Sequence, residues 1–288
     1  MANYAAAMRD WTDSDAPLSA FLIRQLHQRL MTGVRGQDRH PGRFREVQVV
    51  IGAGRRFVPP PPERLRDCID DLGGYLKRDR RPFDPLVDAF LAHYQFEAIH
   101  PFEDGNGRVG RLLLALCFPR WGMLTRPWLY LSPFFEGHRR EYMDRLLAVS
   151  TDGDWAGWVG FCLEGVVDAA ADTARRCDAL LDLRAELTAK IADAGGKARL
   201  LALADGLFET PLVRVTKLAE RFGVKYDTAL SDCRRLADAG VLAELPDAYP
   251  KTYYNPAVFA LAYDVDAAED PAAPPGASGA GSVFVTGT

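Results

Sequence analysis

Apolar residues recur every three or four positions over long stretches of this chain, a spacing that predicts a mostly helical protein. Residues 18–31, LSAFLIRQLHQRLM, follow this spacing and end just before Gly33. No internal repeat accompanies the pattern. Further helices are expected over residues 63–78, 84–100, 106–118, 137–149 and 154–190.

One stretch has a different pattern. Residues 44–58, FREVQVVIGAGRRFV, place Phe44, Val47, Val49 and Ile51 ahead of a Gly-Ala-Gly turn, which favours a β-hairpin. Four prolines at 59–62 follow, and proline suits the first turn of a helix better than a central strand. A small β-hairpin is therefore expected before the helix over 63–78.

A second group of elements follows the Ala-Gly-Gly segment at 194–196, a plausible domain boundary. The pattern there reads helix, helix, helix and then a short hairpin. The expected domains are residues 1–192, 193–263 and a tail, 264–288, whose Ala, Pro and Gly content predicts disorder. The predicted core of the second domain consists of Leu218, Ala219, Phe222, Val224, Ala229, Leu230, Cys233 and Leu236.

Composition narrows the function classes only moderately. The 288 residues are 48% hydrophobic, enough for a sizeable core, and the net charge of −4 gives no general case for binding nucleic acid or anionic membranes. The five cysteines are odd in number and form no CxxC pair, which indicates reduced thiols in a cytoplasmic protein. No apolar stretch approaches the roughly 20 residues of a membrane span, and no signal peptide is recognisable.

The most informative segment is HPFEDGNGRVGR, residues 100–111, a polar stretch between two apolar ones. Pro101 disfavours continuation of the preceding helix beyond His100, and a new helix is expected from Asn106. The segment is therefore a tight loop at a helix N-terminus, where Gly105 and Gly107 let main-chain N–H groups approach a ligand.

Such a loop is suited to a polyphosphate, because free N–H groups and the helix dipole both favour anions. Arg108 and Arg111 share one helix face and can hold two phosphates. Asp104 offers an oxygen ligand for phosphate-bound Mg²⁺, and His100 is the natural general base. Phe102 is expected to anchor the loop in the core. These residues predict a site for a nucleoside triphosphate, Mg²⁺ and a nucleophile that loses a proton.

This segment resembles the signature of the Fic family, H-x-F-x-[DE]-[AG]-N-[GK]-R-x-x-R. The surrounding PGRFREVQVVIG, HYQFEAIH and LYLSPFFEGHRREYMDRL segments are also similar, and the resemblance covers about residues 1–190. It implies a Fic-type helical bundle with a hairpin flap. The matching positions are His100, Phe102, Asp104, Gly105, Asn106, Gly107, Arg108 and Arg111.

The resemblance implies protein adenylylation, in which AMP passes from ATP to a Ser, Thr or Tyr hydroxyl of a target protein. His100 would deprotonate the hydroxyl, and Asp104 would hold Mg²⁺. The amides of residues 105–107 and the Asn106 side chain would hold the α-phosphate, with Arg108 and Arg111 on the β- and γ-phosphates.

The resemblance also implies a docking surface for the target protein and a pocket for the adenine ring. The target protein would dock along the 44–58 flap by strand addition, and Tyr142 or Met143 would contribute to the adenine pocket. Homodimers are common among such proteins, so a homodimer is a further expectation.

Two alternatives stay within the same chemistry. The transferred group could be UMP or phosphocholine, whereas phosphorylating relatives carry Lys where this chain has Gly107.

Some relatives are inhibited by a helix [ST]-x-x-x-E-[GN], and Ser132–Gly137, SPFFEG, matches this pattern. We interpret that match as accidental, since Pro133 and two phenylalanines suit a packed helix start.

His93, Glu97 and His100 lie at i, i+4 and i+7, a spacing that can bind a metal. The favoured interpretation is that His93 and Glu97 pack beside or support the catalytic histidine. A further hypothesis is that Glu97 favours the protonated form of His100.

Residues 197–262 resemble a winged helix-turn-helix, with a hairpin wing at AGVLAEL and KTYYNP. DNA binding does not follow, because residues 193–262 carry nine Lys or Arg and nine Asp or Glu, without the basic footprint of a DNA reader. A protein partner is favoured over DNA. The alternative from a different class is a DNA-binding regulator that uses the Fic site as a nucleotide sensor.

Overall fold

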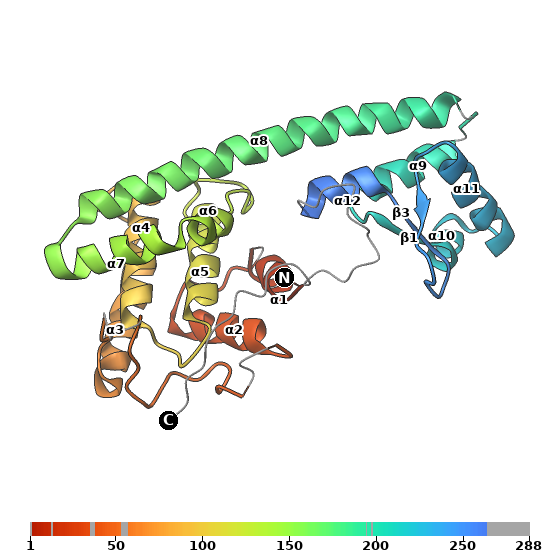
Figure 1. Ribbon diagram of the computed structural model, residues 1–288. Helices are drawn as coiled ribbons and strands as arrows, with labels where there is room; N and C mark the ends of the chain where they lie inside the picture. The colour runs from red at the N-terminus through yellow and green to blue at the C-terminus, as the bar shows by residue number, and fades with distance from the viewer. Residues whose placement is uncertain are drawn as a thin grey trace. The chain divides into compact units, whose positions relative to one another are not determined.

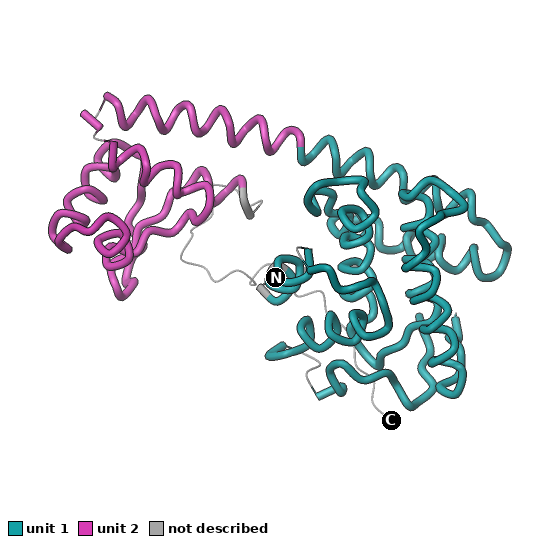
Figure 2. Tube along the Cα trace, turned by 180° about the vertical axis from the view of Figure 1, so that it is seen from behind, with its two compact units in different colours: residues 1–173 teal, residues 174–288 magenta. Residues whose placement is uncertain are grey.

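The computed structural model describes residues 2–12, 14–34, 38–52, 57–193, 195–196 and 198–263. These residues form a mostly helical protein with one small sheet (Figure 1). The chain divides into two compact units, residues 1–173 and 174–288 (Figure 2). The predicted disordered tail over 264–288 lies outside the described residues.

Unit 1 is a helical bundle built around α4 (Pro85–Ile99) and α5 (Asn106–Arg120). Both helices are apolar on most sides, so they are buried by neighbours all round. The surrounding elements are α1 (Ala2–Thr12), α2 (Ala20–Met31), the 3-10 turn η1 (Pro62–Arg64), α3 (Leu65–Leu76), α6 (Ser132–Gly137), α7 (Arg139–Asp152) and the first part of α8 (Trp155–Asp193).

Local sequence sets several helix ends. Ser19 caps α2, its hydroxyl accepting the Leu22 N–H at 3.4 Å, and Asp84 caps α4, its carboxylate accepting the Leu86 N–H at 2.9 Å. The predicted helices over 18–31, 63–78, 84–100, 106–118 and 154–190 are confirmed with small shifts at their ends. The predicted helix over 137–149 is found as α7, and α1 was not predicted.

The predicted hairpin over 44–58 is mostly wrong. Within described residues 44–52 and 57–58, backbone pairing is limited to one antiparallel bridge between Ile51 and Phe57. A two-stranded ribbon without a further strand is marginal. Here side chains satisfy the backbone instead: Gln48 donates to the carbonyls of Val49 and Pro59, both at 3.0 Å.

Unit 2 packs α9 (Ala198–Leu207), α10 (Val215–Phe222), α11 (Tyr226–Asp238) and α12 (Pro256–Tyr263) with a three-stranded antiparallel sheet. The sheet order is β1 (Leu212–Arg214), β3 (Thr252–Tyr254), β2 (Ala243–Glu244), with Leu212 and Ala243 both opposite Tyr254. The predicted hairpin is present, whereas β1 and α12 were not predicted. All eight predicted core residues belong to the unit 2 core, four buried and four partly buried.

The division between units falls within α8, not at the Ala-Gly-Gly segment where the sequence pattern suggested it. Trp158, Phe161 and Cys162 join the core of unit 1, and Leu183 and Leu187 join that of unit 2. A continuous helix can serve two cores because its apolar stripe changes partner along its length. Among the described residues, no helix combines the length and apolar character needed to cross a membrane.

Candidate active site

The turn from α4 into α5 presents the polar loop at the surface of the bundle. His100 caps α4 in the left-handed conformation (φ 49°, ψ 61°), and its N–H donates to the Phe96 carbonyl at 3.0 Å. Gly105 is also left-handed (φ 82°) and immediately precedes α5. A non-glycine residue in the left-handed region of φ and ψ is strained unless its surroundings hold it. The hydrogen bonds around His100 therefore keep it in this conformation.

Asn106 holds the loop from within. Its side-chain oxygen accepts the Phe102 N–H at 2.9 Å, and its side-chain nitrogen donates to the Phe102 carbonyl at 2.8 Å. Asn106 is only 2% exposed. The Asn106 side chain, which was predicted to bind the α-phosphate, therefore bonds the loop instead. The main-chain N–H of Asn106, at the start of α5, remains suited to an anion.

Phe102 anchors the loop in the core, as predicted, and is fully buried. Its ring stacks on the imidazole of His27 with centroids 3.7 Å apart and the planes 2° from parallel. The two nitrogens of His27 are both bonded: Nδ1 accepts the Gly42 N–H at 2.8 Å, so Nε2–H donates to the Asp104 carbonyl at 2.9 Å. Burial lowers the pKa of His27. Sequence reasoning missed this residue, whose only signal was a polar residue on the buried face of α2.

Arg45 is a second residue that the sequence did not reveal, since nothing in its spacing marks it. It is buried, and its guanidinium donates to the carbonyls of His100 at 2.9 Å, Val47 at 3.0 Å and Pro60. Its own N–H donates to the Pro101 carbonyl at 2.9 Å. Arg45 therefore joins the 45–60 segment to the His100 turn.

The His100 imidazole has one ring nitrogen bonded to the main chain. Its Nδ1 lies 3.3 Å from the Glu97 carbonyl, and because a carbonyl only accepts, Nδ1 carries the proton and Nε2 is the basic nitrogen. Burial lowers the pKa of His100 to about 4, against a raising effect of the hydrogen bond to the Glu97 carbonyl; Arg45 lowers the pKa and Asp104 raises it by smaller amounts. The side chain is thus neutral at pH 7 and able to accept a proton.

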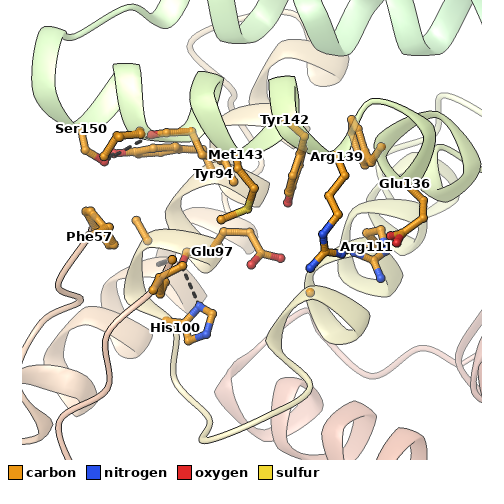
Figure 3. A pocket seen from close by; sticks show the side chains of 17 residues that line it. Phe57, Tyr94, Glu97, His100, Arg111, Glu136, Arg139, Tyr142, Met143 and Ser150 are labelled. Carbon is orange, nitrogen blue, oxygen red and sulfur yellow. Dashed lines mark hydrogen bonds and ion pairs between the residues drawn. The ribbon is translucent and has the colours of Figure 1, made fainter. Parts of the chain in front are cut away.

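His100 borders a cavity of about 530 Å³ (Figure 3). Figure 3 shows Arg111, Arg139 and Glu136 at one end of the cavity, whereas the other, largely apolar end carries Phe57, Tyr94 and Met143. Tyr142 also lines the cavity, and its hydroxyl is 3.0 Å from His93 Nε2. The structure therefore brings the predicted residues His100, Gly107, Arg111, Tyr142 and Met143 to one cavity, together with the unpredicted Arg139.

Asp104 and Arg108 lie beside that cavity rather than in its lining. The Asp104 carboxylate accepts the Gly105 N–H at 2.6 Å and pairs with Arg108 at 3.6 Å. Both side chains are partly exposed, so they are accessible to a polyphosphate at the start of α5. Gly107 leaves room for Arg111, because a Cβ there would lie 3.1 Å from its Nη1.

The metal-binding alternative for the α4 face is contradicted. Among the described residues no three His, Cys, Asp or Glu side chains are grouped to hold a metal, since His93 instead contacts Tyr142. The Glu97 main-chain carbonyl accepts the Nδ1–H of His100 and raises its pKa, but the lowering effect of burial is larger.

Helix α6 contains the SPFFEG segment. Phe135 of this segment is buried against Trp158 and Tyr142, whereas Glu136 borders the cavity and lies 3.4 Å from Arg139. Figure 3 shows Glu136 and Arg111 at the same end of the cavity. The phenylalanines thus pack as expected for a structural helix.

The five cysteines all lie in described residues, and none of them forms a disulfide there.

Residues 17–118 match the Fic/DOC family. Protein adenylyltransferase fic-1 of Caenorhabditis elegans is 37% identical over 101 residues, 35% of this chain and 19% of that protein. A probable protein adenylyltransferase of Aquifex aeolicus is 32% identical over 122 residues, 42% of this chain and 36% of that protein. This chain thus spans well under half the length of these relatives.

The fold is also similar to that of a solved Fic family protein from Desulfovibrio desulfuricans G20. The TM-score is 0.52 at 23% identity, covering 88% of this chain and 72% of that one. The segment that matches the Fic/DOC family, residues 17–118, contains the polar loop near its C-terminal end.

Proposed function

We propose that this protein transfers AMP from ATP to a hydroxyl side chain of a target protein. The observation that carries the proposal is the placement of His100: its Nδ1 is tied to the Glu97 carbonyl, and its ring borders a cavity that also holds Gly107 and Arg111. The similarity to proteins named adenylyltransferases supports the same chemistry.

In the proposed reaction the target hydroxyl oxygen attacks the α-phosphorus of ATP. The bond from that phosphorus to the bridging oxygen breaks, pyrophosphate leaves, and the hydroxyl proton passes to Nε2 of His100. The N–H groups at the start of α5 would hold the α-phosphate, and Arg108 and Arg111 would stabilise the charge on pyrophosphate. The negative charge of bound ATP would raise the low pKa of His100 and strengthen it as a base.

Mg²⁺ fits this site as a phosphate-bound ion. One accessible carboxylate, Asp104, lies beside the α5 N-terminus, and Mg²⁺ on a nucleotide typically takes one or two carboxylates. Asp104 would hold the ion, which would neutralise phosphate charge.

The target protein would dock along the segment that includes Val50, Ile51 and Val58. Val50 and Val58 are exposed, and the Ile51–Phe57 bridge lies at the cavity. An extended target segment could add its backbone there.

For unit 2 we propose a protein-binding role with a winged-helix arrangement. The order helix, strand, two helices and hairpin supports it. Among the acidic residues of α11, which do not favour DNA, Asp232 accepts hydrogen bonds from Arg199 of α9 at 2.8 and 3.0 Å, and Asp227 is exposed. A mobility shift with random duplex DNA that disappears at high salt would favour DNA instead.

The test of the main proposal is incubation of the chain with Mg²⁺ and ATP labelled at the α-phosphate, with and without candidate target proteins. Label should appear on protein, mass spectrometry should show an added AMP, and His100→Ala should abolish it. Label from UTP or from CDP-choline instead of ATP would replace AMP with UMP or phosphocholine. Absence of label from all three donors in the presence of a binding target would overturn the proposal.

A further inference from the structure

Glu97 is a buried acid to which the proposed reaction assigns no role. It lies on α4 one turn before His100 and is 8% exposed. Its Oε1 is buried without a hydrogen-bond partner among the described residues. A buried polar group that lacks a partner costs about 1–3 kcal/mol, so a ligand that satisfied it would recover this free energy.

The carboxyl nevertheless has space reserved for it. Gly110 on α5 faces it, and a Cβ at that position would collide with the Glu97 carboxyl and crowd the Phe96 ring. Figure 3 shows the carboxyl projecting into the cavity, between His100 on one side and Tyr142 and Arg139 on the other.

The position of Glu97 along the cavity indicates which part of a ligand it meets. The cationic end of the cavity has Arg111 and Arg139 beside the Glu136 carboxylate, and the largely apolar end has Phe57, Tyr94 and Met143. A nucleotide with its phosphates at the cationic end and its base at the apolar end places its sugar in the middle, beside Glu97.

Resting on the proposed function, we infer that Glu97 is a specificity-determining residue that hydrogen-bonds a ribose hydroxyl of the nucleotide. Carboxyl oxygens accept bonds from hydroxyl groups, and a vicinal diol offers two donors to one carboxyl group. Burial raises the pKa of Glu97 to about 7, against a lowering effect of Arg111. A hydroxyl can donate to the ionised form and also accept from the protonated form, so both forms suit a ribose.

The inference predicts discrimination against deoxyribonucleotides. A site with a buried polar group rejects a ligand that lacks the matching hydroxyl, because the group is then left without a partner. Wild type should bind ATP about tenfold or more tightly than 2′-deoxy-ATP or 3′-deoxy-ATP, the effect of losing one such bond. Glu97→Met should weaken ATP binding and bring the ratio close to one.

The experiment is calorimetric titration of the full chain with ATP, 2′-deoxy-ATP and 3′-deoxy-ATP, each with Mg²⁺, for wild type, Glu97→Met and Glu97→Gln. Glu141→Met is the matched control, since Glu141 is an exposed α7 acid paired with Arg145 at 3.1 Å, and its ratios should equal those of wild type. Thermal melts of the same samples should show Glu97→Met at least as stable as wild type, because an unpartnered polar group is removed.

Glu97→Gln keeps an acceptor oxygen and should retain part of the preference, which provides a second variant if the methionine protein does not fold. Equal binding of the three nucleotides by wild type, or an unchanged preference in a folded Glu97→Met protein, would overturn the inference. If the protein discriminates between ATP and the deoxynucleotides but transfers no AMP, the inference about Glu97 stands and the proposed reaction is wrong. No binding of any of the three nucleotides would overturn both.

Discussion

Arg45 donates from Nε to the main-chain carbonyl of His100 at 2.9 Å, so a buried cation holds the residue proposed as general base in its left-handed conformation. The same guanidinium reaches Val47 and Pro60. Loop geometry at His100 and the course of the 45–60 segment therefore depend on one side chain.

Arg45→Gln is expected to lower the free energy of unfolding by about 3 kcal/mol, because several buried carbonyls lose their donor. It should also raise the pKa of His100, since the nearby positive charge disappears. Arg45→Lys keeps the charge but loses the planar fork, so it should destabilise while leaving the pKa of His100 nearly unchanged. Urea unfolding and an NMR titration of His100 measure the two effects.

Arg43→Gln is the control for Arg45→Gln, because Arg43 is exposed and lies two residues away. In this variant neither the free energy of unfolding nor the pKa of His100 should change. A His100 titration that is the same in Arg45→Gln and wild type would contradict the electrostatic part of this prediction.

Stability should rise with pH between about 5 and 6.5. His27, His93 and His100 have folded-state pKa values below the ordinary value of 6.5, because each is buried. The unfolded chain binds protons in this window that the native one does not, so this stability is present above pH 6.5 and lost as the pH falls. Glu97 has the opposite effect on the pH dependence of stability. Its pKa is raised to about 7, so in this window the native state holds a proton on Glu97 that the unfolded chain does not.

Three histidines outweigh one glutamate, so the slope of unfolding free energy against pH should be positive. Glu97→Met should steepen it by up to about one proton, or about 1.4 kcal/mol per pH unit. Chemical denaturation at several pH values measures the slope. A flat or negative slope in wild type would show that the histidines are not held neutral in the native state.

Gly110→Ala is expected to destabilise unit 1 and weaken nucleotide binding, because the new methyl group would displace the Glu97 carboxyl and the Phe96 ring. Gly74→Ala is the matched control. Gly74 lies in α3 and is exposed, and a methyl group added to it would meet no atom within 4 Å, so alanine there should stabilise by about 0.5–1 kcal/mol. Thermal melts measure the stability of both variants. Similar shifts of the melting temperature in Gly110→Ala and Gly74→Ala would contradict the packing argument.

Asn106→Asp should lower the rate of AMP transfer, because it keeps the acceptor for the Phe102 N–H but loses the donor to the Phe102 carbonyl. Asn255→Asp is the matched control: Asn255 is also buried, donates to Val241 at 2.6 Å and accepts from Val258 at 2.7 Å, but lies in unit 2. Both variants should lose about 1–3 kcal/mol of stability. Equal transfer rates in the two would show that loop shape at Asn106 does not control the reaction.

Much of the site was predictable because its chemistry is local in sequence. His100, Gly107 and Arg111 occur within one turn and one helix start, so their spacing alone places them together. Arg45 and His27 were not predictable, because their partners His100 and Asp104 are 55 and 77 residues away along the chain.

Among the described residues, the predicted hairpin is confirmed only at the Ile51–Phe57 bridge, again because of contacts that the local sequence does not reveal. Apolar spacing over Phe44 to Ile51 favours a strand, yet a strand forms only where a partner strand satisfies its backbone. In this fold the side chains of Arg45 and Gln48 bond the nearby carbonyls.

The sequence by itself determined most of the helices, the unit 2 core and the polar loop at the start of α5, because helix periodicity, proline and glycine act over a few residues. Only the tertiary structure decided which groups hold that loop and where the Glu97 carboxyl points. It also decided that α8 serves two cores, since burial and hydrogen bonding between distant segments depend on how the helices pack.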